Sequence, residues 1–325
     1  MTFPRRNFLQ LAAGAAALPS VWGVAWGLDY PTRPARLIVG FPAGGSAADV
    51  AARLVGQWLS ERLGQQFIVE NRPGAASNIA TESVVRAPPD GYTLLLVTPP
   101  NAFNATLYDN LSFNFIRDIF PIAGIIRVPY VMVVNRSVPA KTVAEFVTYA
   151  KANPGKINMA SGGTGSTPHV AGELFKMMTG VNLTHVPYPR GSFYPDLLGG
   201  EVQVAFSPMI ASIEFIRAAK LRALAVTTAM RVDALPDVPT VGESVPGYEA
   251  SGWLGIGAPK NTPSGIIEKL NKEINAGLND PKLKVRIAEI GGIPLAGSAR
   301  DFGKLVADET EKWGKVIRAA GIKAE

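Results

Sequence analysis

The 325-residue chain contains no cysteine. This absence excludes disulfides, thiolate nucleophiles and cysteine-type zinc sites, and it removes the lipid-attachment cysteine that a bacterial lipoprotein needs. Only two histidines are present, His169 and His185, which are too few for a histidine-rich metal site. We therefore expect neither a metal nor a cofactor.

A large excess of one charge is also missing. The chain has 32 basic and 26 acidic residues and a net charge of +6, which falls to +4 if Arg5 and Arg6 leave with the leader described below. There is no block of five or six like charges and no basic stripe with interleaved aromatic residues, so the composition argues against a nucleic-acid partner. A weakly positive protein suits a small anionic ligand.

No apolar run reaches the length of about 20 residues that a membrane span requires. The opening, MTFPRRNFLQLAAGAAALPSVWGVAWG, has the twin arginine Arg5-Arg6, a short apolar run over 11–18 and a small-x-small cleavage site over 25–27. This pattern predicts a twin-arginine export signal over 1–27 that is removed from the mature protein. We therefore expect a periplasmic protein, in a compartment where ATP and nicotinamide cofactors are scarce.

Short apolar runs alternate with amphipathic segments of helical period along the mature chain, which predicts parallel sheets with crossover helices. A proline-rich segment, LPDVPTVGESVPG over 235–247, is typical of a connector between lobes. The expected strands are 36–41, 67–70, 93–97, 130–134, 157–160, 183–186, 202–206 and 222–226, and the expected helices are 47–63, 78–86, 143–152, 170–178, 211–219, 264–278, 282–289 and 300–320.

The first candidate site is the corner FPAGGSAAD over 41–49, where a strand stops and a helix starts. Helix N-termini expose unpaired N–H groups and a partial positive charge, and glycines let an anion come close. The corner has neither a phosphate-loop motif nor the third glycine of a dinucleotide fingerprint, so a carboxylate fits it better than a triphosphate. Asp49, in the first helical turn, has an equally good interpretation as a residue that complements the helix dipole.

The second candidate is the corner ASGGTGSTPHVAGELF over 160–175. Ser161, Thr164, Ser166 and Thr167 supply donors, and glycines between them allow close approach. Pro168 at a helix start lacks an N–H that would be unpaired there. Ser166 or Thr167 also has an alternative role as a helix N-cap only. Two such corners in distant segments favour a shared anion site.

Three further segments are expected on the same sheet edge, because ligands of open α/β sheets bind outside the carboxyl ends of the strands. In YPRGSFYPDLLGG, Arg190 is either a bidentate carboxylate ligand or a solvated surface arginine. GAASNIA and VTPPNAFN contribute further polar residues. The complete set of candidate ligand-binding residues is Phe41, Ala43, Gly44, Gly45, Ser46, Asp49, Ser77, Asn78, Thr98, Asn101, Gly163, Thr164, Gly165, Ser166, Thr167, His169, Arg190 and Ser207.

Catalytic patterns are missing. The sequence has no G-x-S-x-G, no H-E-x-x-H and no carboxylate cluster. His169, beside the glycine-rich corner, is better interpreted as a hydrogen-bonding wall residue than as a general base. We therefore expect a binding protein rather than an enzyme, and a periplasmic hydrolase or isomerase that uses His169 remains the less favoured alternative.

Taken together, these corners and the segments VENRPGAASNIATESVVRAPPDGYTLLL, DLLGGEVQVAF, KLRALAVTT and ALPDVPTVGES resemble the Bug family, the extracytoplasmic solute-binding proteins of tripartite tricarboxylate transporters. The resemblance covers essentially the whole mature chain. It implies a two-lobed α/β fold of the periplasmic binding protein type (type II-like, Venus flytrap), with mainly parallel sheets flanked by helices. The implied lobes are 28–129 plus 237–325, and 130–236.

The resemblance also implies a function. Members capture a small carboxylate, such as a di- or tricarboxylate, an acidic amino acid or an aromatic acid. They deliver it to a large and a small membrane subunit of a secondary transporter, without ATP. A monomer is expected. A ligand-sensing partner of a histidine kinase is the alternative that the sequence leaves open.

Departures from the family pattern concern the edges of the expected pocket. Family members often have an aspartate after the strand that is here QVAF, where this chain has Ser207. The segment before DLLGG is compact and aromatic. Phe193 and Tyr194 are therefore candidate pocket walls, although at least one of them is expected in the lobe core.

Overall fold

The computed structural model describes residues 29–44, 46–108, 110–188 and 192–323. The predicted export signal over 1–27 and the candidates Gly45 and Arg190 lie outside these residues. From Pro31 onward the contacts define a single unit, to which the sheets and helices below belong. Among the helices that the structure describes, none combines the length and apolarity that a membrane span requires.

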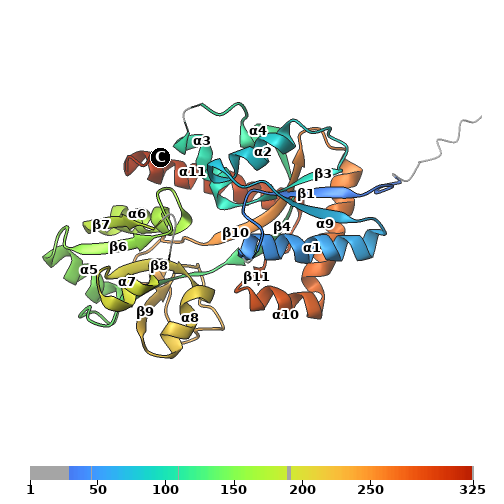
Figure 1. Ribbon diagram of the computed structural model, residues 1–325. Coiled ribbons are helices and arrows are strands. Elements are labelled where there is room, and N and C mark those ends of the chain that lie inside the picture. Colours follow the sequence, from blue (N-terminus) through green and yellow to red (C-terminus); the bar gives the residue numbers. More distant parts are fainter. Residues whose placement is uncertain (1–28, 45, 109, 189–191, 324–325) are drawn as a thin grey trace, which may run out of the picture. The chain divides into compact units, whose positions relative to one another are not determined.

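The first sheet has six strands in the order β11-β4-β10-β3-β1-β2. β1 pairs in parallel with β2 and β3, whereas β10 is antiparallel to β3 and β4, and β11 is antiparallel to β4. In Figure 1 these strands carry the blue, green and orange colours of distant parts of the chain. Their bounds are β1 Ala35–Val39, β2 Phe67–Asn71, β3 Thr93–Val97, β4 Ile119–Val128, β10 Gly252–Pro259 and β11 Ile293–Pro294.

The second sheet has five strands in the order β7-β6-β8-β5-β9. β6 pairs in parallel with β7 and β8, and β5 is antiparallel to β8 and β9. One continuous stretch of chain, green to yellow in Figure 1, supplies all five strands. Their bounds are β5 Tyr130–Asn135, β6 Ile157–Ser161, β7 Leu183–Pro187, β8 Val204–Pro208 and β9 Leu221–Val226.

The eight expected helices are all present, because apolar period and capping residues agree near their ends. The helices Pro99–Leu107, Phe115–Asp118 and Tyr194–Gly199 were not predicted. Helix α1, for example, starts at the N-cap Ser46 and ends at Gly64, which adopts the left-handed conformation that glycine favours at helix C-termini. The described helices are α1 Ala47–Leu63, η1 Ala75–Ser77, α2 Asn78–Val85, α3 Pro99–Leu107, α4 Phe115–Asp118, α5 Val143–Ala152, α6 Thr167–Thr179, α7 Tyr194–Gly199, α8 Met209–Arg217, η2 Val241–Glu243, α9 Ser264–Asn279, α10 Pro281–Glu289 and α11 Ala299–Ala319.

The expectation of mainly parallel sheets needs correction. Four strand pairings are parallel and five are antiparallel, so both sheets are mixed. Three antiparallel pairings involve β4 and β10, which the sequence pattern did not predict. β4 contains Pro121 and Gly124, and β10 contains three glycines, so neither shows an uninterrupted β-branched run.

The chain passes from one sheet to the other at two places. Pro129 alone separates β4 from β5, and residues 227–251 join β9 to β10. The second passage contains the predicted connector over 235–247, which is irregular apart from η2 and a bridge between Val226 and Thr240. All five strands of the second sheet fall within 130–236. The exact lobe boundaries stay a prediction.

The core near β10 is organised by a buried carboxylate. Trp253 and Trp313 are both fully buried, and both indole N–H groups donate to Glu309 Oε2, at 3.3 and 2.6 Å. Because indole N–H groups need a partner when buried, Glu309 on α11 satisfies two of them at once. This arrangement fixes the start of β10, which borders the site described next.

Candidate ligand-binding site

The first predicted corner connects β1 to α1. Ser46 is the N-cap, and its hydroxyl accepts the N–H of Asp49 at 3.1 Å. The Asp49 carboxylate accepts the N–H of Gly44, at 3.1 Å, and holds the loop against the helix. Gly44 has a φ of 97°, which a residue with a side chain adopts only with strain. The corner is therefore a tight loop whose backbone is fixed by Asp49.

Asp49 has further partners that explain its charge. It is 2% exposed, and it also accepts hydrogen bonds from Arg53 and from Asn71 Nδ2. Burial alone would raise the pKa of Asp49, but the bonds from Arg53, Asn71 and Gly44 together lower it below its ordinary value. The side chain is thus an ionised brace for the loop, as the dipole interpretation predicts.

The second corner connects β6 to α6 and repeats this design. Ser166 is the N-cap, and its hydroxyl accepts the N–H of His169 at 3.4 Å and donates to Gly163 O at 2.7 Å. The His169 ring reaches back over the turn, where Nδ1 accepts the N–H of Gly165 at 3.0 Å. In each corner, the third helical residue therefore both donates its N–H to the serine cap and anchors the glycine loop through its side chain.

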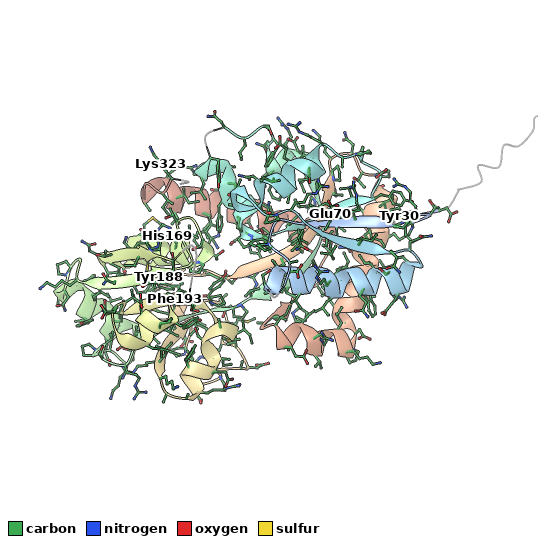
Figure 2. The ribbon with its side chains drawn as sticks, in the orientation of Figure 1. Tyr30, Glu70, His169, Tyr188, Phe193 and Lys323 are labelled. Atoms are coloured by element: carbon green, nitrogen blue, oxygen red, sulfur yellow. The ribbon has the colours of Figure 1, made fainter. Side chains whose placement is uncertain are left out.

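The imidazole of His169 is enclosed. It is 5% exposed and stacks on His185 with a centroid distance of 3.6 Å and an interplanar angle of 6°. Because Nδ1 accepts the Gly165 N–H, the ring proton lies on Nε2, which is 3.6 Å from Glu173 Oε1. Burial alone would raise the pKa of Glu173, but hydrogen bonds from His169 and Lys176 lower it. Figure 2 shows His169 among the elements around the five-stranded sheet.

A third helix start belongs to α3. Thr98 and Asn101 form a capping box, in which Asn101 Oδ1 accepts the N–H of Thr98 at 2.7 Å. Asn101 Nδ2 donates to Thr81 Oγ1 at 2.8 Å. The first two helical positions are Pro99 and Pro100, which have no N–H, so this corner offers a hydroxyl but no free amide in its first two positions.

Ser77 and Asn78, two further candidates, lie where η1 meets α2. Ser77 is 1% exposed and Asn78 is 8% exposed. Asn78 Oδ1 accepts a hydrogen bond from Asn104 Nδ2 at 2.6 Å. Gly40, at the end of β1, lies against Ser77, because a Cβ added at Gly40 would be 1.8 Å from Ser77 Oγ. Ser77 therefore packs against the segment that leads from β1 into the first corner.

The helix starts meet at one cavity of about 300 Å³. The N-terminal residues of α1, α3, α6 and α8 all contribute to its lining, so elements attached to both sheets enclose it. None of the described lining residues is charged. The lining residues are Phe41, Ser46, Ala47, Ala48, Thr98, Pro99, Pro100, Val128, Tyr130, Ser166, Thr167, Pro168, Pro208, Ile210, Gly252, Trp253 and Leu254.

The predicted candidates fall into two groups, those that line the cavity and those that do not. Phe41, Ser46, Thr98, Ser166 and Thr167 belong to its lining. The remaining described candidates are found in the loops or behind the lining, where several of them make the bracing contacts given above. This second group consists of Ala43, Gly44, Asp49, Ser77, Asn78, Asn101, Gly163, Thr164, Gly165, His169 and Ser207.

Ser207 contacts Tyr194 and does not belong to the cavity lining. It is fully buried, and its hydroxyl lies 2.5 Å from the hydroxyl of Tyr194, which also contacts Ser212 at 2.9 Å. Phe193 is 8% exposed, belongs to the core beneath this sheet and stacks on Tyr194. The expectation that at least one of the two aromatic residues lies in the lobe core is therefore confirmed.

Other lining residues were not predicted from the sequence. Val128, Tyr130, Gly252, Trp253 and Leu254 come from the ends of β4, β5 and β10. Tyr130 contacts Thr167, and burial raises the pKa of its phenol to about 12, so the phenol stays protonated and can donate. The passage from β4 through Pro129 into β5 could have indicated these wall residues. A segment that joins two sheets borders the space between them.

The geometry does not favour catalysis by His169. Its Nδ1 accepts the N–H of Gly165, and His185 covers one face of its ring. His169 also does not belong to the cavity lining. Among the described residues, no group of three His, Asp or Glu side chains is placed to hold a metal ion. The described lining of the cavity contains no His, Asp, Glu or Lys side chain.

Two α/β sheets, two chain passages and one cavity lined by helix N-termini are the architecture of a two-lobed solute-binding protein. The comparisons identify the family within this class. Residues 51–322 match the model of the tripartite tricarboxylate transporter family receptor, and the chain belongs to this family. The resemblance to the Bug family is confirmed.

Individual relatives agree with this assignment. Protein BugT of Bordetella pertussis is 36% identical over 298 residues, which cover 90% of this chain and 91% of BugT. The structure of Rpa4515 of R. palustris with adipate is 39% identical, has a TM-score of 0.77 and covers 91% of this chain and 99% of its own. MatC of Rhodopseudomonas palustris, with bound malate, is 27% identical with a TM-score of 0.73, and the match covers 89% of this chain and 100% of MatC.

Proposed function

We propose that this chain is a periplasmic receptor that captures a small carboxylate and delivers it to the membrane subunits of a tripartite tricarboxylate-type transporter. The convergence of helix N-termini on one cavity with no charged described lining residue carries the proposal. The family assignment supports it, as do the relatives with adipate and malate.

Backbone groups supply the positive end of the site. The first N–H groups of α1 and α6 have no intrahelical partner, and both helices direct the positive ends of their dipoles to the cavity. Ala47 and Ala48 on α1 and Thr167 on α6 bring such amides to the lining. The hydroxyl of Ser46 lies beside them, whereas the hydroxyl proton of Ser166 is donated to Gly163 O. A carboxylate, with two oxygens that accept several hydrogen bonds, matches this donor set.

Hydrogen bonds to the charged ligand should supply much of the affinity. Each such bond contributes about 1.5–3 kcal/mol, so two or three of them give roughly 3–9 kcal/mol before the cost of association is subtracted. In this proposal Asp49 and His169 position the two loops, and the lining residues contact the ligand.

An acidic substitution at the cavity tests the proposal. Ala47→Asp places a carboxylate at the first position of α1, where it favours the helix dipole but repels a bound anion. We expect at least a tenfold loss of affinity for adipate or malate in calorimetric titration, without a lower melting temperature of the unliganded protein.

The matched control is Ala144→Asp, because Ala144 is exposed and lies in the first turn of α5, outside the cavity lining. This variant should bind as the parent does. Ligand should raise the melting temperature of parent and control by mass action. Equal affinity in all three proteins, or no melting shift for any acid tested, would contradict the proposal.

A further inference from the structure

The cavity lining is divided in composition. Serine and threonine hydroxyls and helix amides lie at the starts of α1 and α6, whereas much of the remaining lining is apolar. Phe41, Val128, Pro208, Ile210, Trp253 and Leu254 belong to this apolar wall, together with the prolines that begin α3.

A polar ligand body would be poorly matched to such a wall. A hydroxyl buried against this wall without a hydrogen-bond partner is unfavourable, and an ionised carboxylate buried there is more so. A methylene group placed there gains about 0.8 kcal/mol instead. The wall therefore discriminates between acids that carry the same carboxylate but differ in the rest of the molecule.

We propose, building on the function proposed above, that the cavity takes a carboxylate with an apolar body, namely a short aliphatic or single-ring acid. Polyhydroxylated acids and tricarboxylates are discriminated against. The volume of about 300 Å³ lies at the small end of the range for ligand pockets, which suits a small acid of this kind.

Ile210 is the wall residue best suited to test recognition of the ligand body separately from binding of its carboxylate. It lies in the first turn of α8, is 41% exposed and belongs to the lining. Its side chain packs near Gly291, where an added Cβ would be 2.6 Å from Ile210 Cβ. A change of its chemistry alters the apolar wall without touching α1 or α6.

A series of monocarboxylates tests the proposal, because charge is constant across it. Affinities for butyrate, hexanoate and gluconate are measured by calorimetry or by competition. Each methylene should add about fourfold in affinity, so hexanoate should bind about fifteenfold more tightly than butyrate. Gluconate, which has the chain length of hexanoate but a hydroxyl on each further carbon, should bind at least tenfold more weakly than hexanoate.

A variant pair locates the effect. Ile210→Asn should reduce the hexanoate-to-butyrate ratio several-fold, and Ile79→Asn should leave it unchanged, because Ile79 is 51% exposed on α2 and outside the cavity lining. Equal or tighter binding of gluconate, or a flat chain-length series, overturns the apolar-body inference while acid binding itself survives. Failure of every acid to bind overturns the proposed function as well.

Discussion

The brace formed by Asp49 offers the sharpest test of how the first corner is held. Asp49→Asn keeps the size of the side chain but replaces one oxygen by an NH2 group. In the parent, one carboxylate oxygen accepts from Gly44 N and Arg53 Nε, and the other accepts from Arg53 Nη2 and Asn71 Nδ2. Whichever way the amide is turned, two of these contacts become donor-to-donor contacts.

The size of the effect follows from these contacts. A hydrogen bond to a charged group contributes about 1.5–3 kcal/mol. The contacts with Arg53 are discounted because its side chain is 51% exposed and therefore screened by solvent. We expect Asp49→Asn to lower the free energy of unfolding by about 2–3 kcal/mol, which corresponds to a fall in melting temperature of about 3–5 °C for a unit of this size. Carboxylate affinity should fall too, since the loop loses its anchor.

The assay is thermal unfolding as a function of pH. Because the folded-state pKa of Asp49 is lowered below 3.8, its contribution is present above pH 3.8 and is lost as the pH falls through the folded-state pKa. The difference between parent and variant should therefore be full at pH 7 and should shrink below about pH 3.8.

The control is Asp308→Asn, which alters an exposed pair with Lys304 on α11 and should leave the melting temperature unchanged within error. The reasoning is refuted if Asp49→Asn also unfolds as the parent does at pH 7. It is refuted equally if the difference between them is the same at pH 3 and pH 7.

Two further predictions concern single contacts. Gly291→Ala and Gly321→Ala both place alanine at a positive φ, 70° and 63°, and each should lower the free energy of unfolding by about 1–2 kcal/mol. Only the alanine at position 291 collides with Ile210. Calorimetry should therefore show weaker carboxylate binding for Gly291→Ala and unchanged binding for Gly321→Ala. Tyr194→Phe removes the hydroxyl partner of the buried Ser207 and should lower the free energy of unfolding in urea by about 1–3 kcal/mol. Its carboxylate affinity should equal that of the parent, and a loss would place Ser207 in the binding site.

The sequence predicts elements well where local signals agree. Helix α1 and strand β3 were expected with the bounds that the structure has, since Ser46 and Gly64 mark the helix ends and β3 is a continuous apolar run. Helix α3 was missed because two consecutive prolines usually indicate that a helix is interrupted. Prolines at the first positions of a helix remove only N–H groups that have no intrahelical partner there.

The candidate site was predicted in part for a similar reason. Corner residues such as Ser46 and Ser166 are identifiable from strand-to-helix punctuation alone. The wall from β4 and β10 is not, because its position depends on pairings between segments more than 100 residues apart, such as Trp253 with Arg127. Nor does spacing reveal that Asp49 and His169 turn toward their own loops.

The repeated serine-capped corner has a consequence for where this receptor can work. Amide groups and helix dipoles do not gain or lose protons in the ordinary acidity range. Of the described lining residues only Tyr130 titrates, and burial raises its pKa to about 12. Capture should then follow the ionisation of the metabolite itself and persist across mildly acidic and alkaline surroundings.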